Sequence, residues 1–348
     1  MRKLLLTSLS LLLCMSAAAQ EIGVKPAKGV AFKGEDVALQ IGGRIQVRHT
    51  YEAETELANY SIPRLRLALK GSMYKNWKWE FQSDFAKKGQ TTLKDGLIEY
   101  AHSSALNVRF GQYKVRFDRQ QFESSGRQTF VDRSVAAGRL GLDRDVGVLV
   151  HGSLSNKKFQ YSAGLFNGGG EGGANIAKRG PLFVGRLSVN PLGDFGLSQG
   201  DIKPSKKHLV FFDLAVAHQS EDDDKTEGAD TRFVGGAGYR FGGLYLVGEY
   251  YNRSQKRQSV ETKSSGLYGQ GSFMVVPEKF ELAVRYASYD PNTDVDDDIQ
   301  TEIMAGFNVY FNKLGHSMKL SADLAQVKDE KKGDDSHLRS RVQVQVVF

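Results

Sequence analysis

Arginines gather in one polar segment, residues 116–143, which separates two stretches of alternating apolar and polar residues. The segment contains five of them: Arg116, Arg119, Arg127, Arg133 and Arg139. A guanidinium keeps its charge and offers a planar set of donors that can bind two oxygens of one oxyanion. If the segment folds into a confined space, where the effective dielectric constant is lower than in bulk water, these groups would favour small anions such as phosphate.

A second group of arginines occupies alternate positions in the neighbouring stretches. By strand parity they share a face with polar side chains: Arg44, Arg48, Arg64, Arg66 and Arg109, with Arg232, Arg240 and Arg285 further along. Side chains of a strand point alternately to opposite faces, so we expect these guanidiniums to face one common interior. The alternative is that they only hydrate a polar wall, without selecting for anions.

Carboxylates fall on the same predicted face and oppose a strong anion preference. They are Asp84, Asp145, Glu249, Glu302 and Asp323. Because charged side chains away from bulk water are usually paired, we expect these carboxylates to anchor the arginine-rich segment by pairing with its guanidiniums.

Other motifs do not indicate a catalytic or metal site. Gly168–Gly173 lacks the Lys-Ser/Thr of a phosphate-binding loop, so we interpret it as an outer loop. Asp294–Asp298 lacks the glycine and the final glutamate of a calcium loop, and with Glu221–Asp224 it predicts an acidic outer rim. The seven histidines show no zinc spacing. We therefore expect no catalytic residue, metal or cofactor.

The elements that must position these residues are strands. In the last eight residues Val342, Val344, Val346 and Phe348 share one face, opposite Arg341, Gln343 and Gln345. From Val37 onward sixteen segments of this kind follow one another, with one apolar and one polar face. They are 37–49, 61–70, 77–85, 92–102, 106–113, 145–154, 158–167, 182–190, 209–218, 231–241, 244–253, 266–276, 280–289, 300–312, 316–327 and 337–348.

The links between the segments alternate in length. Short links, such as 241–243 and 277–279, alternate with longer polar links, such as 52–59, 116–143 and 253–263. This is the connectivity of an all-β, transmembrane, antiparallel up-and-down β-barrel of 16 strands, with short turns on the periplasmic side and longer loops outside. The link 191–207 is long where a short turn is due, and we expect it to be an irregular inner turn.

The N-terminus has the three parts of a secretory signal peptide. Arg2 and Lys3 precede an apolar run that ends in Ala17-Ala18-Ala19, and the single cysteine, Cys14, lies within this leader. No later apolar run approaches the ~18 residues of a membrane helix. The formal net charge of +7 is too small to indicate nucleic-acid binding. We therefore expect a signal peptide (1–19), a periplasmic lead-in (20–36) and a barrel (37–348) with a constriction loop (116–143).

Several motifs resemble the phosphate-selective porin O and P family of outer-membrane proteins. They are Thr129–Ser134, Asp143–Gly152, Pro63–Gly71 with Trp77–Phe81, Val108–Gln112, Gly164–Gly168 and the terminal Phe348. The resemblance covers essentially the whole chain after the leader, and it implies a sixteen-stranded, trimeric diffusion channel whose third extracellular loop folds inward. The chain is shorter than the best-studied members, its long loops are reduced, and Arg116 stands where similar sequences usually carry proline, so the resemblance leaves phosphate selectivity open.

The resulting expectation is a passive outer-membrane porin that prefers small anions such as phosphate. Its expected partners are outer-membrane lipids, two further copies in a homotrimer, and the barrel-assembly machinery, which would read Phe348 in the last strand. The alternatives are a general or sugar-related porin without anion preference, a barrel enzyme, and an adhesive or structural barrel.

Overall fold

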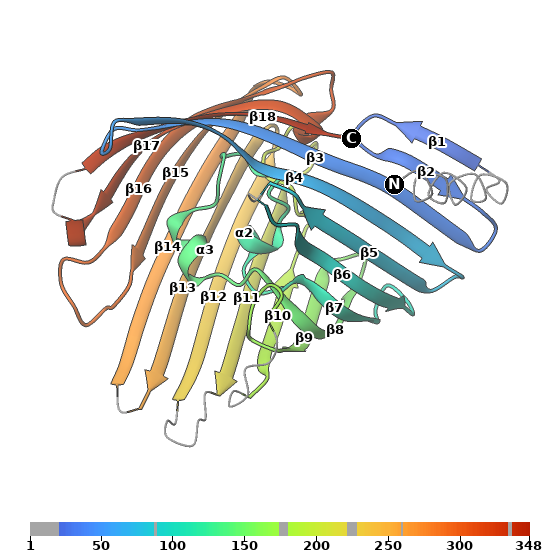
Figure 1. Ribbon diagram of the computed structural model, residues 1–348, viewed down its shortest axis with the longest axis horizontal. Helices are drawn as coiled ribbons and strands as arrows, with labels where there is room; N and C mark the ends of the chain where they lie inside the picture. Colours follow the sequence, from blue (N-terminus) through green and yellow to red (C-terminus); the bar gives the residue numbers. More distant parts are fainter. Residues whose placement is uncertain (1–20, 87–88, 174–179, 221–227, 259, 333–335) are drawn as a thin grey trace.

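The computed structural model describes residues 21–86, 89–173, 180–220, 228–258, 260–332 and 336–348, so the predicted leader lies outside it. Within these ranges sixteen antiparallel strands, from β3 (Val37–Glu52) to β18 (Ser336–Val347), form one closed sheet in chain order. The sheet closes because β18 pairs with β3, from Arg339 opposite Glu52 to Val347 opposite Arg44. The predicted up-and-down barrel is confirmed (Figure 1).

The other strands of the barrel lie between these two in the sequence. They are β4 (Leu57–Met73), β5 (Trp77–Asp84), β6 (Thr92–Ala101), β7 (Asn107–Lys114), β8 (Arg144–Leu154), β9 (Phe159–Phe166), β10 (Leu182–Val189), β11 (Leu209–Ser220), β12 (Gly228–Phe241), β13 (Leu244–Arg257), β14 (Val260–Val276), β15 (Phe280–Asp290), β16 (Gln300–Tyr310) and β17 (Met318–Asp329).

A short hairpin precedes the barrel, where the sequence predicted only a lead-in. Its strands are β1 (Glu21–Lys25) and β2 (Gly29–Lys33), and β2 pairs with β3 from Val30 opposite Ile41 to Lys33 opposite Ala38. These residues of β3 lie beyond the last pair of the β18 ladder. The hairpin therefore covers an edge of β3 that would otherwise leave its backbone groups without strand partners.

The two faces of the sheet differ as a membrane barrel requires. In β18 the side chains of Val344 and Val346 are 47% and 39% exposed on the outer face, whereas Gln343 and Gln345 are buried on the inner face. Lipid lies against the outer face and the lumen against the inner one, so apolar and polar residues alternate. The predicted parity of the last strand is confirmed.

Several strands are longer than their apolar alternation indicated. The ladder between β13 and β14 continues through Arg253–Ser264 to Arg257–Val260, so the predicted loop 253–263 is a short link. The predicted link 52–59 is likewise reduced to residues 53–56. Both predictions of loop length were wrong because strand ends that project beyond the lipid meet water on both faces, and there hydrogen bonding continues after the apolar alternation has ceased.

The short turns fit the demands of a tight hairpin. Gly242 and Gly243, which join β12 to β13, have φ of 60° and 93°. A two-residue turn of this kind needs positive φ at both central positions, where glycine has no steric cost. Met274 N of β14 donates to Gly243 O at 3.0 Å, so the hydrogen bonding between β13 and β14 extends to this turn.

The longest described link, between β7 and β8, contains two short helices. They are α2 (Arg119–Phe122) and α3 (Val135–Leu140), and Figure 1 shows both within the ring of strands. Asp118 caps α2 by accepting a hydrogen bond from Gln121 N at 2.8 Å, and Ser134 caps α3 by accepting from Ala137 N at 3.2 Å.

Two single turns of 3₁₀ helix complete the structure, η1 (Gly315–Ser317) and η2 (Glu330–Lys332). In the described part of the chain, no helix has the length and apolar character needed to cross a membrane.

Candidate functional site

The segment 116–143 is held against the inner wall by carboxylates. Glu249 on β13 accepts hydrogen bonds from the backbone N–H of Arg119 at 2.6 Å and of Gln120 at 3.1 Å. Asp323 and Glu302 accept from the N–H groups of Val131 (3.0 Å) and Val135 (3.1 Å) in the same way. The prediction that these carboxylates pair with the guanidiniums of the segment was wrong. They accept instead from backbone N–H groups of the segment, which its short helices and turns leave without partners.

Among the remaining predicted carboxylates, Asp84 pairs with Arg66 of the wall at 2.7 Å. Asp145 lies at the start of β8 and accepts from Gly168 N at 2.7 Å, so it joins β8 to the link that follows β9. Neither of them contacts an arginine of the segment 116–143 in the described structure.

One guanidinium of the segment pairs with a wall carboxylate outside the predicted set, since Arg119 Nη1 lies 3.6 Å from Asp213 Oδ2. Shorter ion pairs join wall guanidiniums to a carboxylate of the segment. Asp132 accepts from Arg48 at 2.6 Å and from Arg64 at 3.3 Å, and Arg341 Nη1 lies 3.7 Å away. Burial alone would raise the pKa of Asp132, but the three arginines outweigh it and hold this pKa well below its ordinary value. One negative charge thus ties the segment to β3, β4 and β18.

Apolar packing and further hydrogen bonds complete the attachment. Ala136, Ala137 and Leu140 of α3 belong to a buried cluster with Tyr251 and Ala287 of the wall. The segment therefore covers the inner face of β13 to β16, with which α3 is in contact. Along the opposite wall, β3 to β8, cavities remain between the strands and the segment.

The five arginines of the segment do not form one cluster. Arg119 is buried, pairs with Glu123 at 3.1 Å and lies 4.0 Å from the centre of the Phe211 ring. Arg116 stacks on Phe122 at 5.1 Å. Arg133 donates to Gln120 O at 2.9 Å and lines a cavity at the loop end of the lumen.

Arg127 and Arg139, by contrast, are both exposed. Arg127 lines a cavity at the short-turn end, whereas Arg139 lies on α3 and lines none of the lumen cavities described below.

The wall arginines face inward, in agreement with their parity. Arg44 donates to Ser125 Oγ at 3.0 Å, and Arg109 pairs with Glu99 at 2.6 Å. Arg48, Arg64 and Arg66 have the carboxylate partners given above. The three further arginines also contact groups inside the barrel: Arg232 with Leu140 O, Arg240 with Ser198 O and Arg285 with Asp132 O.

Two cavities adjoin in the uncovered half of the lumen. The one nearer the loops has a volume of about 220 Å³, and its charged lining comprises six cations and two carboxylates: Arg64, Arg66, Lys94, Lys114, Arg133 and Arg144 with Asp84 and Asp143. The other, of about 930 Å³, opens toward the short-turn end. Four residues line both cavities: Arg66, Lys114, Ser125 and Arg144. We take this junction as the narrow part of the passage.

The sequence reading overlooked two of the cations at the junction. Lys114 is the last residue of β7 and donates to Gln121 O at 2.7 Å, while Arg144 is the first of β8 and pairs with Asp95 at 3.0 Å. They face each other across the β7–β8 ladder. Their position at the two ends of the arginine-rich segment is a signal by which they could have been found.

A third cavity, of about 650 Å³, lies along β5 to β10 at the short-turn end. Arg116 and Arg186 line it together with His151. Arg186 pairs with Asp213 at 2.5 Å, so its charge is compensated. Arg116 has no ion pair among the described residues.

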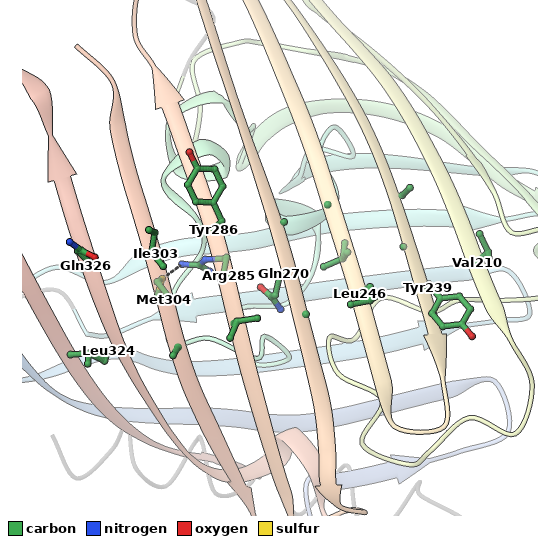
Figure 2. Close-up of a pocket in the computed structure, with 18 of the residues that line it drawn as sticks. Val210, Tyr239, Leu246, Gln270, Arg285, Tyr286, Ile303, Met304, Leu324 and Gln326 are labelled. Carbon is green, nitrogen blue, oxygen red and sulfur yellow. Dashed lines mark hydrogen bonds between the residues drawn. The ribbon is translucent and has the colours of Figure 1, made fainter. Parts of the chain in front are cut away.

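An apolar concavity of about 1010 Å³ lies on the outer face and takes no part in the passage (Figure 2). Small residues form its floor, since Gly248 pairs with Ala237 on one side and with Gly269 on the other. Tyr286 and Leu324, 45% and 51% exposed, flank it. The dashed line in Figure 2 joins Arg285 to Met304, a contact of 2.8 Å made by residues that are buried on the inner face.

Metal ligands do not cluster in the described residues, where no group of three or more histidine, cysteine, aspartate or glutamate side chains could hold a metal ion. The acidic residues 221–224, which the sequence assigned to an outer rim, lie outside the described residues.

Comparisons with solved structures show the same fold. OmpTΔL8, a loop-deletion mutant of the outer-membrane protein OmpT of Vibrio cholerae, superposes with a TM-score of 0.67 and 12% identity, over 90% of this chain and 100% of that one. The anion-selective porin from Comamonas acidovorans gives 0.65 and 16%, with the same coverage. The trimer form of in-vitro folded OmpT gives 0.64 and 11%, again over 90% and 100%.

Comparisons of sequence identify the family. A search of curated proteins finds no match. Residues 39–348, nearly the whole chain and almost all of the barrel, match the family model of phosphate-selective porin O and P. The chain therefore belongs to the phosphate-selective porin O and P family.

Proposed function

We propose that this outer-membrane porin is a passive diffusion channel that prefers small anions, phosphate among them. The observation that carries the proposal is the junction of the two lumen cavities, which Arg66, Lys114, Arg144 and the hydroxyl group of Ser125 line together. Donors of this kind can replace part of the hydration shell of an oxyanion, and their charge sets the sign of the field along the lumen.

The excess of positive charge near the junction supports this sign. Arg66 and Arg144 each have a carboxylate partner. Lys114 donates to backbone carbonyls, and Arg44 donates to the hydroxyls of Ser124 and Ser125. Neither Lys114 nor Arg44 has a carboxylate within ion-pair distance in the described structure, so a passing anion would supply the missing negative charge.

A general porin without anion preference is the second candidate, and a specific observation favours it. Wall arginines are compensated at short distances, as in Arg66–Asp84 (2.7 Å), Arg109–Glu99 (2.6 Å) and Arg144–Asp95 (3.0 Å). A pair of opposite charges attracts an ion of either sign less than a single charge does. Such a channel would also pass uncharged solutes such as sugars.

The reversal potential separates the two candidates. The purified protein is inserted into a planar bilayer that separates two concentrations of potassium chloride, and the voltage of zero current is measured. A voltage with the sign of chloride preference supports the proposal, and added phosphate should lower the chloride current by competing for the same site. A voltage near zero favours the general porin, and a voltage of the opposite sign overturns the anion preference.

The proposal includes assembly and export. We propose a homotrimer that is exported by its N-terminal leader and inserted by assembly machinery that reads the C-terminal strand. The trimer form of the structurally similar OmpT supports the first point. Cross-linking in native membranes, followed by denaturing electrophoresis, tests it, because a trimer gives dimer and trimer bands and a monomer gives neither.

A further inference from the structure

The link between β10 and β11, residues 190–208, turns into the lumen although it lies at the short-turn end of the barrel. Its residues Phe195, Gln199 and Asp201 are only 1%, 1% and 2% exposed. The ring of Phe195 packs edge-on against Phe211 of the wall, with the centroids 4.7 Å apart. We call residues 190–208 the inner turn.

One glutamine of the inner turn makes several contacts with the segment 116–143, which enters from the loop end. Gln199 N donates to Arg127 O at 3.0 Å, and its Oε1 accepts from Thr129 N at 3.0 Å. Its Nε2 donates to Glu123 Oε2 at 2.8 Å. Three hydrogen bonds from one residue thus span the stretch of the segment from Glu123 to Arg127 and Thr129.

The barrel wall fixes Gln199 as well. Gln270 Nε2 donates to its Oε1 at 3.0 Å, and His316 Nε2 donates to its backbone oxygen at 2.8 Å. Because both the side-chain oxygen and the side-chain nitrogen of Gln199 are engaged and buried, the amide has one satisfied arrangement, which specifies one geometry for the contact.

Two arginines reinforce the contact away from the junction of the two cavities. Arg119 donates to Gly196 O and stacks on the rings of Phe195 and Phe211. Arg240 of the wall donates to Ser198 O at 2.5 Å. These guanidiniums therefore join the inner turn to the segment and to the wall, a role that differs from anion binding.

The stretch that Gln199 holds includes residues that shape the junction. Ser124 and Ser125 lie between Glu123 and Arg127, they accept hydrogen bonds from Arg44, and Ser125 lines both lumen cavities. The position of these hydroxyls, and with it the width of the passage, depends on the hydrogen bonds by which Gln199 holds residues 123–129.

We propose that Gln199 is a positioning residue for the pore constriction and that the inner turn and the segment 116–143 form one partition across the lumen. The partition closes the half of the barrel lined by β11 to β17 and directs solutes along β3 to β8. This inference goes beyond anion preference, since it concerns the width and rigidity of the passage and holds for either sign of selectivity.

The first test is the Gln199→Met variant, which keeps the approximate length of the side chain and removes its amide. In planar bilayers it should show a higher single-channel conductance, more open-channel noise and a smaller difference between the currents of small and large ions. Gln160→Met is the matched control, because Gln160 also lines the lumen but makes only a 3.4 Å contact with Lys157 O. Gln199→Met currents identical to those of the control would overturn the proposal.

The second test reports the opening of the partition itself. Residues 20–348 contain no cysteine, so Thr129→Cys introduces one thiol. Thr129 is 2% exposed and its hydroxyl has no hydrogen-bond partner, which makes the substitution mild. The thiol should react slowly with a neutral maleimide in the folded barrel and roughly tenfold faster when Gln199→Met is added, as the loss of ordinary hydrogen bonds predicts. An unchanged rate would contradict the proposal.

A variant of Arg240, which also holds the inner turn, tests the proposal if Gln199→Met does not fold. Arg240→Gln removes the contact with Ser198 O and leaves Gln199 intact. Like Gln199→Met, it should raise both the conductance and the rate of thiol labelling. If a folded Arg240→Gln barrel shows neither change, the inner turn does not position the constriction.

Discussion

Arg48 of the barrel wall donates from Nη1 to Oδ2 of Asp132 over 2.6 Å, which joins the first strand of the barrel to the segment that narrows its lumen. The same carboxylate accepts from Arg64. The loop thus contributes the negative partner and the wall the positive ones. Asp132 therefore weakens the positive field of the lumen and also holds the constriction in place.

Replacing Asp132 with asparagine should increase anion preference. The change removes one negative charge beside Arg48, Arg64 and Arg341 and keeps the size of the side chain. The reversal potential should move toward the chloride equilibrium value, and open-channel noise should rise because the tie is weaker. Asp296→Asn, on an exposed outer loop, removes the same charge far from the junction and should leave both unchanged. An unaltered reversal potential in the Asp132 variant would place the filter elsewhere.

The effect of Asp132→Asn should be constant between about pH 5 and 8. The pKa of Asp132 in the folded protein lies below its ordinary value of about 3.9. A carboxyl group with a lowered pKa contributes stability that is present above the ordinary pKa and is lost only as pH falls through the folded pKa. The difference in reversal potential between wild type and variant, measured across this range, should not vary. A difference that shrinks toward pH 5 would mean that the carboxyl group titrates there.

Arg44→Gln should lower anion preference without leaving an unpaired carboxylate. Arg44 contacts the hydroxyls of Ser124 and Ser125 and no carboxylate in the described structure. At an effective dielectric constant of about 20, a unit charge about 8 Å from a passing ion contributes roughly 2 kcal/mol. The reversal potential should therefore shift measurably toward zero. Arg139→Gln is the control, since Arg139 is exposed on α3 away from the lumen cavities.

Glu249→Leu should loosen the segment 116–143. Glu249 accepts from the N–H groups of Arg119 and Gln120 and from the hydroxyls of Tyr251 and Tyr268. Each buried donor left without an acceptor costs about 1–3 kcal/mol. The melting temperature in detergent should fall, and the fall should exceed that of Tyr268→Phe, which removes only one of these donors. Equal melting temperatures for the two variants would contradict this role of Glu249.

Deleting Phe348 should reduce the yield of folded barrel. Its backbone N donates to Gly43 O at 3.0 Å and its oxygen accepts from Gly43 N at 2.7 Å, so it completes the closing ladder between β18 and β3. Its ring covers Gly43, where an added Cβ would lie 2.6 Å from Cζ of Phe348. The heat-modifiable fraction on electrophoresis should fall for the deletion and for Gly43→Ala. Phe348→Tyr keeps the ring and the backbone and should fold normally. A loss of folded barrel equal to that of the deletion would contradict the role given to ring packing and the closing hydrogen bonds.

The sequence by itself determined the barrel and the inner face of its strands. Alternation with a period of two, as in Val342, Gln343 and Val344, depends only on the geometry of an extended chain between lipid and water, so it can be read without knowing the neighbours. The inward direction of Arg44, Arg66 and Arg109 followed from the same rule. The ends of the strands could not be predicted by this rule, because residues beyond the lipid, such as Arg253 and Ser264, do not belong to an alternating apolar face.

Only the tertiary structure decided which charges meet. Glu249 and Arg119 are far apart in the sequence, and their contact runs through a backbone N–H, a group that every residue except proline carries and that no pattern of residue types can mark. The same holds for Gln199, whose partners come from the segment 116–143, from β14 and from the turn η1. Pairing across a lumen depends on how the links fold back between the strands, and the period of the strands contains no information about that.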